Sequence, residues 1–399
     1  MTFIDIEKAY DSVPQRLVWD ALMNIRIGIP EVQMIEAMYE KCTSSVKTKI
    51  GQTNWLSVET GLRQGSVLSP ILFITVMDEI HKNVKQKIGS KETNALLFAD
   101  DIVIWGEDET EVQEQVNVWN QEIEKYGMKI SVGKSKTVVM TRDKREGRGN
   151  VEVNGQRLEV VKSFKYLGSI LSEDGTIKEE IGKRIQQANG FYQCVRGLVW
   201  NQEVPEKCKN VLFSMYYTPI LTYAAGTWTT TKRDESRIQA AEMKFLRGII
   251  GKTRRDKIRN VDIRDRIGLP KLQDRIEASK LKWYGHMMRM EEDRVPKRIF
   301  MEKIPGRRPR GRPRKRWTNT VEECIEKRGV KVKDVLKEGS EWWRDRKLWR
   351  SLVHNPTQKT GSGKLRRRRT IAELLHYYQL LNQKSFRHSN QNHSWITSY

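Results

Sequence analysis

Two adjacent aspartates at a sharp bend between apolar runs place the strongest constraint on this chain. The bend is Phe98-Ala99-Asp100-Asp101, and apolar residues fill 95–97 before it and 102–105 after it. Short apolar runs on both sides of a tight turn predict a β-hairpin with two carboxylates at its tip. An ordinary solvated turn is the alternative, because aspartate tolerates bends and bonds its own backbone. Four specified residues, however, recur by chance at only about one position in 10⁵.

A third carboxylate, Asp5, interrupts the short apolar run Phe3-Ile4-Asp5-Ile6. A lone aspartate in an apolar strand costs free energy unless it is paired or ligates a metal. Nucleic-acid polymerases hold two divalent cations about 4 Å apart with such carboxylates, and the cations stabilise the attacking and leaving oxygens of phosphoryl transfer. Asp5, Asp100 and Asp101 together therefore predict a two-metal site.

Two further segments match a known family in the same order. Residues 3–11 read Phe-Ile-Asp-Ile-Glu-Lys-Ala-Tyr-Asp, and residues 61–73 read Gly-Leu-Arg-Gln-Gly-Ser-Val-Leu-Ser-Pro-Ile-Leu-Phe. The second is a glycine-bearing loop that leads into an apolar helix with proline in its first turn. With residues 98–101, these segments resemble reverse transcriptases, in particular those of non-LTR (LINE-type) retrotransposons. The resemblance continues through residues 127–136 and 166–169 and covers about residues 2–172.

The resemblance implies an α+β fold, in which a right-hand polymerase palm, an antiparallel sheet with helices, precedes an α-helical thumb and a basic, partly disordered tail. The expected regions are the palm without fingers (1–172), a thumb-like region (173–300), a basic low-complexity linker (301–320), a small Trp- and Arg-rich helical segment (321–355) and a mostly disordered tail (356–399). An ordinary helical domain remains an alternative to the thumb, because periodicity cannot separate them.

Apolar spacing predicts individual elements of these regions. The expected helices cover about 68–87, 110–126, 177–200, 206–217 and 234–250. Residues 128–140 predict strands, and Asn154-Gly155 predicts a hairpin turn.

The resemblance also implies roles for single residues. Asp5 and Asp100 would ligate two Mg²⁺ ions with support from Asp101, and Mn²⁺ could substitute. Tyr10 would exclude a ribose 2′-OH. Lys134 would protonate the leaving pyrophosphate, with Lys129 and Lys136 as alternatives. The residues expected to contact the nucleotide and template are Gln64 and Gly65, and those expected at the primer end are Phe98, Ala99, Tyr166, Leu167 and Gly168.

Charge is unevenly distributed along the chain. Residues 1–140 hold 15 Lys+Arg against 20 Asp+Glu, whereas residues 141–399 hold 58 against 30. An excess of this size favours a polyanionic partner, because each lysine or arginine that meets a phosphate releases condensed counterions. The implied partners are an RNA template, a DNA primer or target, and deoxynucleoside triphosphates.

A basic run at residues 303–317 concentrates this charge. It contains Arg310-Gly311-Arg312-Pro313, which resembles the core of an AT-hook that reads a narrow A·T minor groove. A chance match is the alternative, since the run consists largely of Arg, Pro and Gly. We expect it to bind phosphates, or, like residues 366–369, to direct the protein to the nucleus. The residues expected to bind nucleic acid are Arg310, Arg312, Arg314, Lys315 and Arg316.

Three tryptophans stand among arginines near the end of the basic half. Trp342, Trp343 and Trp349 could stack on bases, or they could form a small helical core with a basic outer face. The sequence leaves both interpretations open.

Completeness and location form the last set of expectations. In the family, basic fingers precede the first catalytic aspartate, but here only residues 1–4 precede Asp5, and no endonuclease region is present. We therefore expect a truncated product with weak or absent activity; the alternatives are a non-catalytic nucleic-acid-binding remnant and an intron-mobility protein. No run approaches the roughly 18 apolar residues of a membrane span, and four separated cysteines predict reduced thiols. We therefore expect a soluble intracellular protein that is located in the nucleus.

Overall fold

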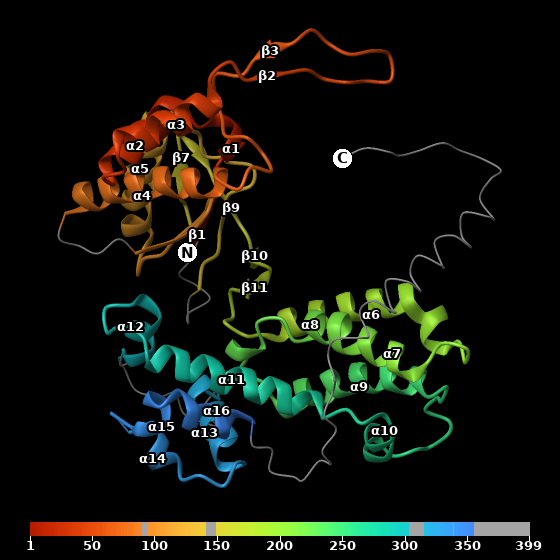
Figure 1. The fold of residues 1–399 in the computed structure, drawn as a ribbon. Coiled ribbons are helices and arrows are strands. Elements are labelled where there is room, and N and C mark those ends of the chain that lie inside the picture. Colours follow the sequence, from red (N-terminus) through yellow and green to blue (C-terminus); the bar gives the residue numbers. More distant parts are fainter. Residues whose placement is uncertain (90–93, 141–148, 303–314, 338, 355–399) are drawn as a thin grey trace. The chain divides into compact units, whose positions relative to one another are not determined.

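The computed structural model describes residues 1–89, 94–140, 149–302, 315–337 and 339–354 (Figure 1). The chain divides into two compact units, Met1–Thr176 and Ile177–Tyr399. The first unit is built on a β-sheet, and the described residues of the second are helical. The predicted α+β class is therefore confirmed.

A five-stranded sheet forms the centre of the first unit, with its strands in the order β4-β5-β1-β6-β9. Its strands are β1 (Thr2–Asp5), β4 (Ala95–Phe98), β5 (Asp101–Ile104), β6 (Lys136–Thr137) and β9 (Glu159–Val160). Neighbouring strands are antiparallel except β6 and β9, which are parallel. The first residues of the chain thus occupy the central strand.

The two faces of this sheet pack against different groups of apolar residues. Ile4, Ile102 and Ile104 pack into the main core together with apolar residues of the helices. Side chains alternate along a strand, so Phe3 and Val103 point to the opposite face, where they form a smaller cluster. The helices of this unit are α1 (Ala9–Ser12), α2 (Gln15–Asn24), α3 (Ile29–Tyr39), α4 (Ser69–Ile88) and α5 (Glu109–Lys125), and α4 and α5 confirm two predicted helices.

Short hairpins complete the first unit. Asn154 and Gly155 have φ values of 52° and 74° and join two strands, which confirms the predicted hairpin turn. The prediction of strands over residues 128–140 was largely wrong: apart from a single bridge from Ile130 to Ile6, only β6 is a strand there. The remaining strands are β2 (Thr43–Ser44), β3 (Leu56–Ser57), β7 (Glu152–Val153), β8 (Gln156–Arg157), β10 (Ser163–Tyr166) and β11 (Ser169–Ser172).

Two hydrophobic cores organise the described part of the second unit. The first gathers aromatic side chains such as Tyr217 and Phe245, whose ring centroids lie 4.7 Å apart. Its helices are α6 (Lys178–Trp200), α7 (Glu206–Leu212), the π-helix η1 (Phe213–Tyr217), α8 (Thr218–Leu221), the 3₁₀ turn η2 (Ala225–Thr227), α9 (Lys232–Ile249) and α10 (Asn260–Ile267). The helices α6 and α9 confirm two predictions, and the third, over 206–217, continues as a π-helix after Leu212.

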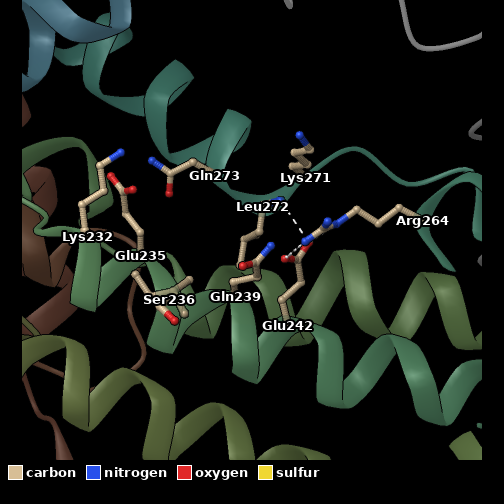
Figure 2. A pocket seen from close by; sticks show the side chains of 10 residues that line it. Lys232, Glu235, Ser236, Gln239, Glu242, Arg264, Lys271, Leu272 and Gln273 are labelled. Carbon is tan, nitrogen blue, oxygen red and sulfur yellow. Dashed lines mark hydrogen bonds and ion pairs between the residues drawn. The ribbon is translucent and has the colours of Figure 1, made fainter. Parts of the chain in front are cut away.

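A buried ion pair fastens three of these segments together beside a cavity of about 310 Å³ (Figure 2). Arg264 of α10 donates to Glu242 of α9 through Nη2 at 2.7 Å, and the backbone N–H of Leu272 donates to the same carboxylate at 3.0 Å. Glu242 and Arg264 are both buried. The two buried charges thus neutralise each other within the second unit.

The second core lies around α11 (Leu272–Met288), which contributes to both cores. Trp343 and Trp349 are buried in this core, so the helical-core interpretation of the tryptophan cluster is confirmed for them. The other helices here are α12 (Val295–Met301), α13 (Trp317–Glu326), α14 (Val332–Leu336), α15 (Glu341–Arg344) and α16 (Arg346–His354). Among the described helices, none combines the length and apolar character that crossing a membrane requires.

Candidate active site

The predicted carboxylate hairpin is formed by β4 and β5. Phe98 pairs with Asp101, which leaves Ala99 and Asp100 as a two-residue turn. Ala99 has φ 52°, a left-handed conformation that costs an L-residue about 1 kcal/mol. The sheet pairing on both sides holds this turn, so Asp100 and Asp101 stand together at the end of the hairpin.

Asp5 lies directly opposite Asp101 across the β1–β5 pair. Both belong to the same face of the sheet as Phe3 and Val103, away from the main core. Burial raises the pKa of Asp101, and the charges of Asp100 and Asp5 raise it further. Like charges at opposing strand positions destabilise a sheet, so this arrangement favours a cation between them.

A loop from the following segment reaches Asp5. The backbone N–H of Ser131 donates to the carbonyl oxygen of Asp5 at 2.8 Å, and the N–H of Asp5 donates to Ser135 Oγ at 3.1 Å. These bonds place Lys134 Nζ 3.3 Å from Asp5 Oδ2. In this segment, Ser131 and Ser135 thus hydrogen-bond the backbone of Asp5, where strands were expected over 128–140.

The three lysines weighed for proton transfer differ in position. Lys134 pairs with Asp5, whereas Lys136 Nζ donates to Glu159 at 2.8 Å and to the carbonyl of Gly133 at 2.7 Å. Lys129 contacts this region through its backbone carbonyl, which accepts a hydrogen bond from the N–H of Glu7. This geometry favours Lys134 over the other two.

The carboxylates fit a divalent cation by charge and by an unused acceptor. Asp5 Oδ2 is buried and accepts no hydrogen bond from the described residues; its contact with Lys134 Nζ at 3.3 Å is an ion pair. Such an acceptor, beside two more carboxylates, suits an oxygen-coordinated metal. As they stand, no three His, Cys, Asp or Glu side chains within the described ranges are grouped closely enough to hold a metal ion. Asp5, Asp100 and Asp101 thus share one site without yet forming a closed ligand set.

Tyr10 lies beside this site. Its ring stacks on Phe73 of α4, with centroids 4.7 Å apart. Burial raises the pKa of the Tyr10 phenol, and the charge of Asp100 raises it further. The N–H of Leu62 donates to the Tyr10 carbonyl at 2.7 Å, so both the ring and the backbone of Tyr10 are fixed.

The glycine-bearing loop packs against the segment that carries Tyr10 and Asp11. Gly61 has φ 92°, and a Cβ there would lie 2.8 Å from the Asp11 carbonyl oxygen, so only glycine fits. Gln64 Nε2 donates to Asp11 Oδ1 at 2.9 Å. Gly65 has φ 83° and an open space around it. The loop therefore presents Gln64 and Gly65 next to the segment that carries Tyr10.

The β10–β11 hairpin packs on the face of the sheet that carries the carboxylates. Its Phe164 and Tyr166 rings contact the Phe3 ring, with centroids 4.4 and 5.6 Å apart. Burial raises the pKa of Tyr166, and the charge of Asp101 adds to this effect. Leu167 and Gly168 form the turn, with φ values of 45° and 84°. At the other hairpin, Phe98 is 62% exposed and available for contact.

The predicted basic segment is only partly described. Arg310, Arg312 and Arg314, with the AT-hook-like tetrapeptide, lie outside the described residues, as do residues 356–399. Lys315 pairs with Glu323 at 2.7 Å, and the N–H of Arg316 donates to Asn319 at 3.1 Å. These two residues thus precede α13, with Arg316 as its N-cap.

Comparison with known proteins identifies the first unit. Residues 1–171 match the family model described as reverse transcriptase (RNA-dependent DNA polymerase). The chain is 26% identical over 194 residues to a Pol polyprotein of retrotransposable element R2 from Nasonia vitripennis, covering 45% of this chain and 19% of that protein. It is also 26% identical over 334 residues to the RNA-directed DNA polymerase of mobile element jockey from Drosophila funebris, covering 79% and 35%.

Residues 1–171 are therefore a reverse transcriptase domain. The relatives place this domain with the reverse transcriptases of non-LTR, LINE-type retrotransposons, which confirms the resemblance found in the sequence. The chain spans only about a fifth to a third of the length of these relatives. A telomerase structure from Candida albicans aligns with 76% of this chain and 51% of its own at 13% identity and a TM-score of 0.32, too low to support an argument.

Proposed function

We propose that this protein acts as an RNA-directed DNA polymerase, adding deoxynucleotides to a DNA primer on an RNA template. One observation carries the proposal: Asp5 lies opposite Asp101 on the sheet face away from the main core, with Asp100 beside it at the hairpin tip. Divalent metals are general in this family. We propose two Mg²⁺ ions here, replaceable by Mn²⁺, held by these three carboxylates; bound metals stabilise the attacking and leaving oxygens of the transfer.

The residues around the carboxylates would bind and orient the substrates. The fixed Tyr10 ring would leave no space for a ribose 2′-OH and so select deoxynucleotides. Gln64 and Gly65 would contact the nucleotide and template. Lys134 balances the charge of Asp5 in this structure and would give a proton to the leaving pyrophosphate. The residues proposed to hold the primer end are Phe98, Ala99, Tyr166, Leu167 and Gly168.

Primer extension tests this function directly. The full chain is given a labelled DNA primer annealed to RNA, the four deoxynucleoside triphosphates, and Mg²⁺ or Mn²⁺. We expect extension by the parent and by Glu107→Gln, which removes an exposed carboxylate just beyond β5. Asp100→Asn should abolish extension while leaving template–primer affinity nearly unchanged.

Two results would count against this proposal. Extension by Asp100→Asn at the parental rate would remove the carboxylates from the mechanism. Tight binding of template–primer without extension by any variant would instead support the second candidate, a nucleic-acid-binding protein without catalysis. That candidate is supported by the excess of lysine and arginine over residues 141–399. For either function we propose a nuclear location, supported by the basic runs at 303–317 and 366–369.

A further inference from the structure

The helices α11 and α16 pack closely in the second unit and border a cavity of about 560 Å³. They approach so closely because Gly285 has no side chain: a Cβ there would collide with the indole of Trp349. Trp349 Nε1 donates to the carbonyl of Leu281 at 3.0 Å. Trp349 and Val353 are buried and line the cavity. The cavity therefore has an apolar floor that is fixed by helix packing.

Basic side chains stand around this floor on both helices. Residues four apart lie on the same face of a helix, so each helix presents its basic residues in a row. The row from α11 and its C-terminal end consists of Lys282, His286 and Arg289, and the row from α16 consists of Arg346, Arg350 and His354. We call the space between them the basic groove.

The basic groove lacks counter-ions in the part of the chain that the structure describes. None of its lining residues is an aspartate or glutamate. Lys282, Arg346 and Arg350 form no ion pair with a described residue. Arg289 uses one N–H to donate to the Trp343 carbonyl at 2.8 Å, which orients its guanidinium. Four cationic side chains thus line the basic groove without a carboxylate partner among the described residues.

The pKa values of two lining residues, Arg289 and His354, are lowered, in part by the neighbouring positive charges. Burial lowers the pKa of Arg289, and the charge of Arg346 lowers it further. Burial also lowers the pKa of His354, and Lys282 and Arg350 are among the charges that add to the effect. Mutual repulsion of this kind would be relieved by an anion placed between the rows.

We propose that the basic groove holds the phosphate backbone of a nucleic-acid strand. Arg346 and His354 are eight residues apart, or about 12 Å along the helix. That length spans more than one phosphate of a strand, since successive phosphates of one duplex strand lie about 3.4 Å apart along the axis. Charges spread along two walls suit a repeating polyanion better than one small anion. Because Trp349 is buried and its N–H is already used, the floor cannot read base edges, and binding is independent of sequence.

This inference deepens the proposed function, on which it rests for the choice of nucleic acid as the polyanion. It adds a binding surface in the second unit, outside the reverse transcriptase domain. It does not depend on catalysis, so it can be tested by binding alone.

The test measures binding of a fluorescein-labelled 20-nucleotide single-stranded RNA to the full chain by anisotropy over a range of salt concentrations. Arg346→Gln/Arg350→Gln removes two groove charges, and both positions are exposed, so folding should be retained. Lys333→Gln/Lys337→Gln removes two exposed charges elsewhere in the same helical segment and is the matched control. Arg346→Lys/Arg350→Lys keeps the charges.

We expect the groove double variant to flatten the plot of log affinity against log salt by about 1.4, because each single-strand phosphate contact contributes about 0.7. The matched control and the lysine variant should keep the parental slope. An unchanged slope in the groove variant, or equal flattening in the control, would overturn the proposal. Displacement of the RNA by polyglutamate as effectively as by polyuridylate at equal charge would also overturn it, indicating an acidic protein partner.

The outcomes separate this inference from the proposed function. A chain that adds no nucleotide but shows the expected slopes retains the basic groove as a binding surface and loses the polymerase. A chain that extends primers with unchanged slopes retains the polymerase and loses the basic groove.

Discussion

Asp101→Asn should stabilise the first unit when no metal is present. Asp5 and Asp101 are opposite one another, and such pairs have Cβ atoms about 4.5–5.5 Å apart. Two unit charges at about 5 Å repel by roughly 0.8 kcal/mol in water and roughly 3 kcal/mol at an effective dielectric constant of about 20. The ion pair of Lys134 with Asp5 offsets part of this repulsion. We therefore expect a gain of about 1 kcal/mol, or roughly 2–4 °C in the melting temperature of a unit of this size.

Differential scanning calorimetry of the full chain in EDTA measures this gain. Glu107→Gln is the control, because it removes an exposed carboxylate outside the site and should leave the transition unchanged. Adding Mn²⁺ should then stabilise the parent more than Asp101→Asn, since a ligand stabilises the state that binds it. An Asp101→Asn protein that melts below the control in EDTA would refute the reasoning.

The same repulsion predicts how stability depends on pH. The pKa of Asp101 is raised in the folded protein by burial and by Asp100 and Asp5. The folded state therefore takes up this proton at a higher pH than the unfolded chain does. As the pH falls from 7 towards the range in which Asp101 titrates, the parent should gain stability relative to Asp101→Asn. A constant difference across this range would show that Asp101 is not strained by its neighbours.

Three further changes test single contacts. Tyr10→Ala in an actively extending protein should raise ribonucleotide incorporation relative to deoxyribonucleotide incorporation, and an unchanged preference would make Tyr10 a packing residue. Lys134→Ala should slow extension by about 10²-fold or more, as expected for loss of a proton donor, whereas Lys136→Ala should have little effect; equal losses would remove the distinction between the two lysines. Glu242→Gln should lower the free energy of unfolding of the second unit by about 3–5 kcal/mol in urea titrations, because it leaves Arg264 buried without its counter-charge, and a loss below about 1 kcal/mol would contradict this role.

The sequence predicted most accurately those features that depend only on neighbouring residues. Short apolar runs on both sides of a sharp bend predicted the carboxylate hairpin, and Asn154-Gly155 predicted its own turn, because these patterns depend on neighbouring residues. The order of motifs indicated the reverse transcriptase domain, which the family match confirmed for residues 1–171.

Other features depend on distant residues and could not be predicted in this way. Apolar content alone suggested strands over 128–140, but the hydrogen bonds of Ser131 and Ser135 to Asp5 turn much of that segment into a loop. The ion pair of Lys134 with Asp5 could not be predicted either, since 129 positions separate the two residues. The basic groove was missed because its rows come from helices far apart in the sequence, although the spacing of Arg346 and Arg350 was a usable signal.

The central claim is that Asp5, Asp100 and Asp101 hold divalent cations. Mn²⁺ titration of the full chain, followed by electron paramagnetic resonance in the presence of template–primer and a deoxynucleoside triphosphate, measures this most directly. We expect the parent and Glu107→Gln to bind Mn²⁺ with the same affinity and stoichiometry, and Asp5→Asn and Asp100→Asn to lose bound metal. Undiminished Mn²⁺ binding by both aspartate variants would contradict the account.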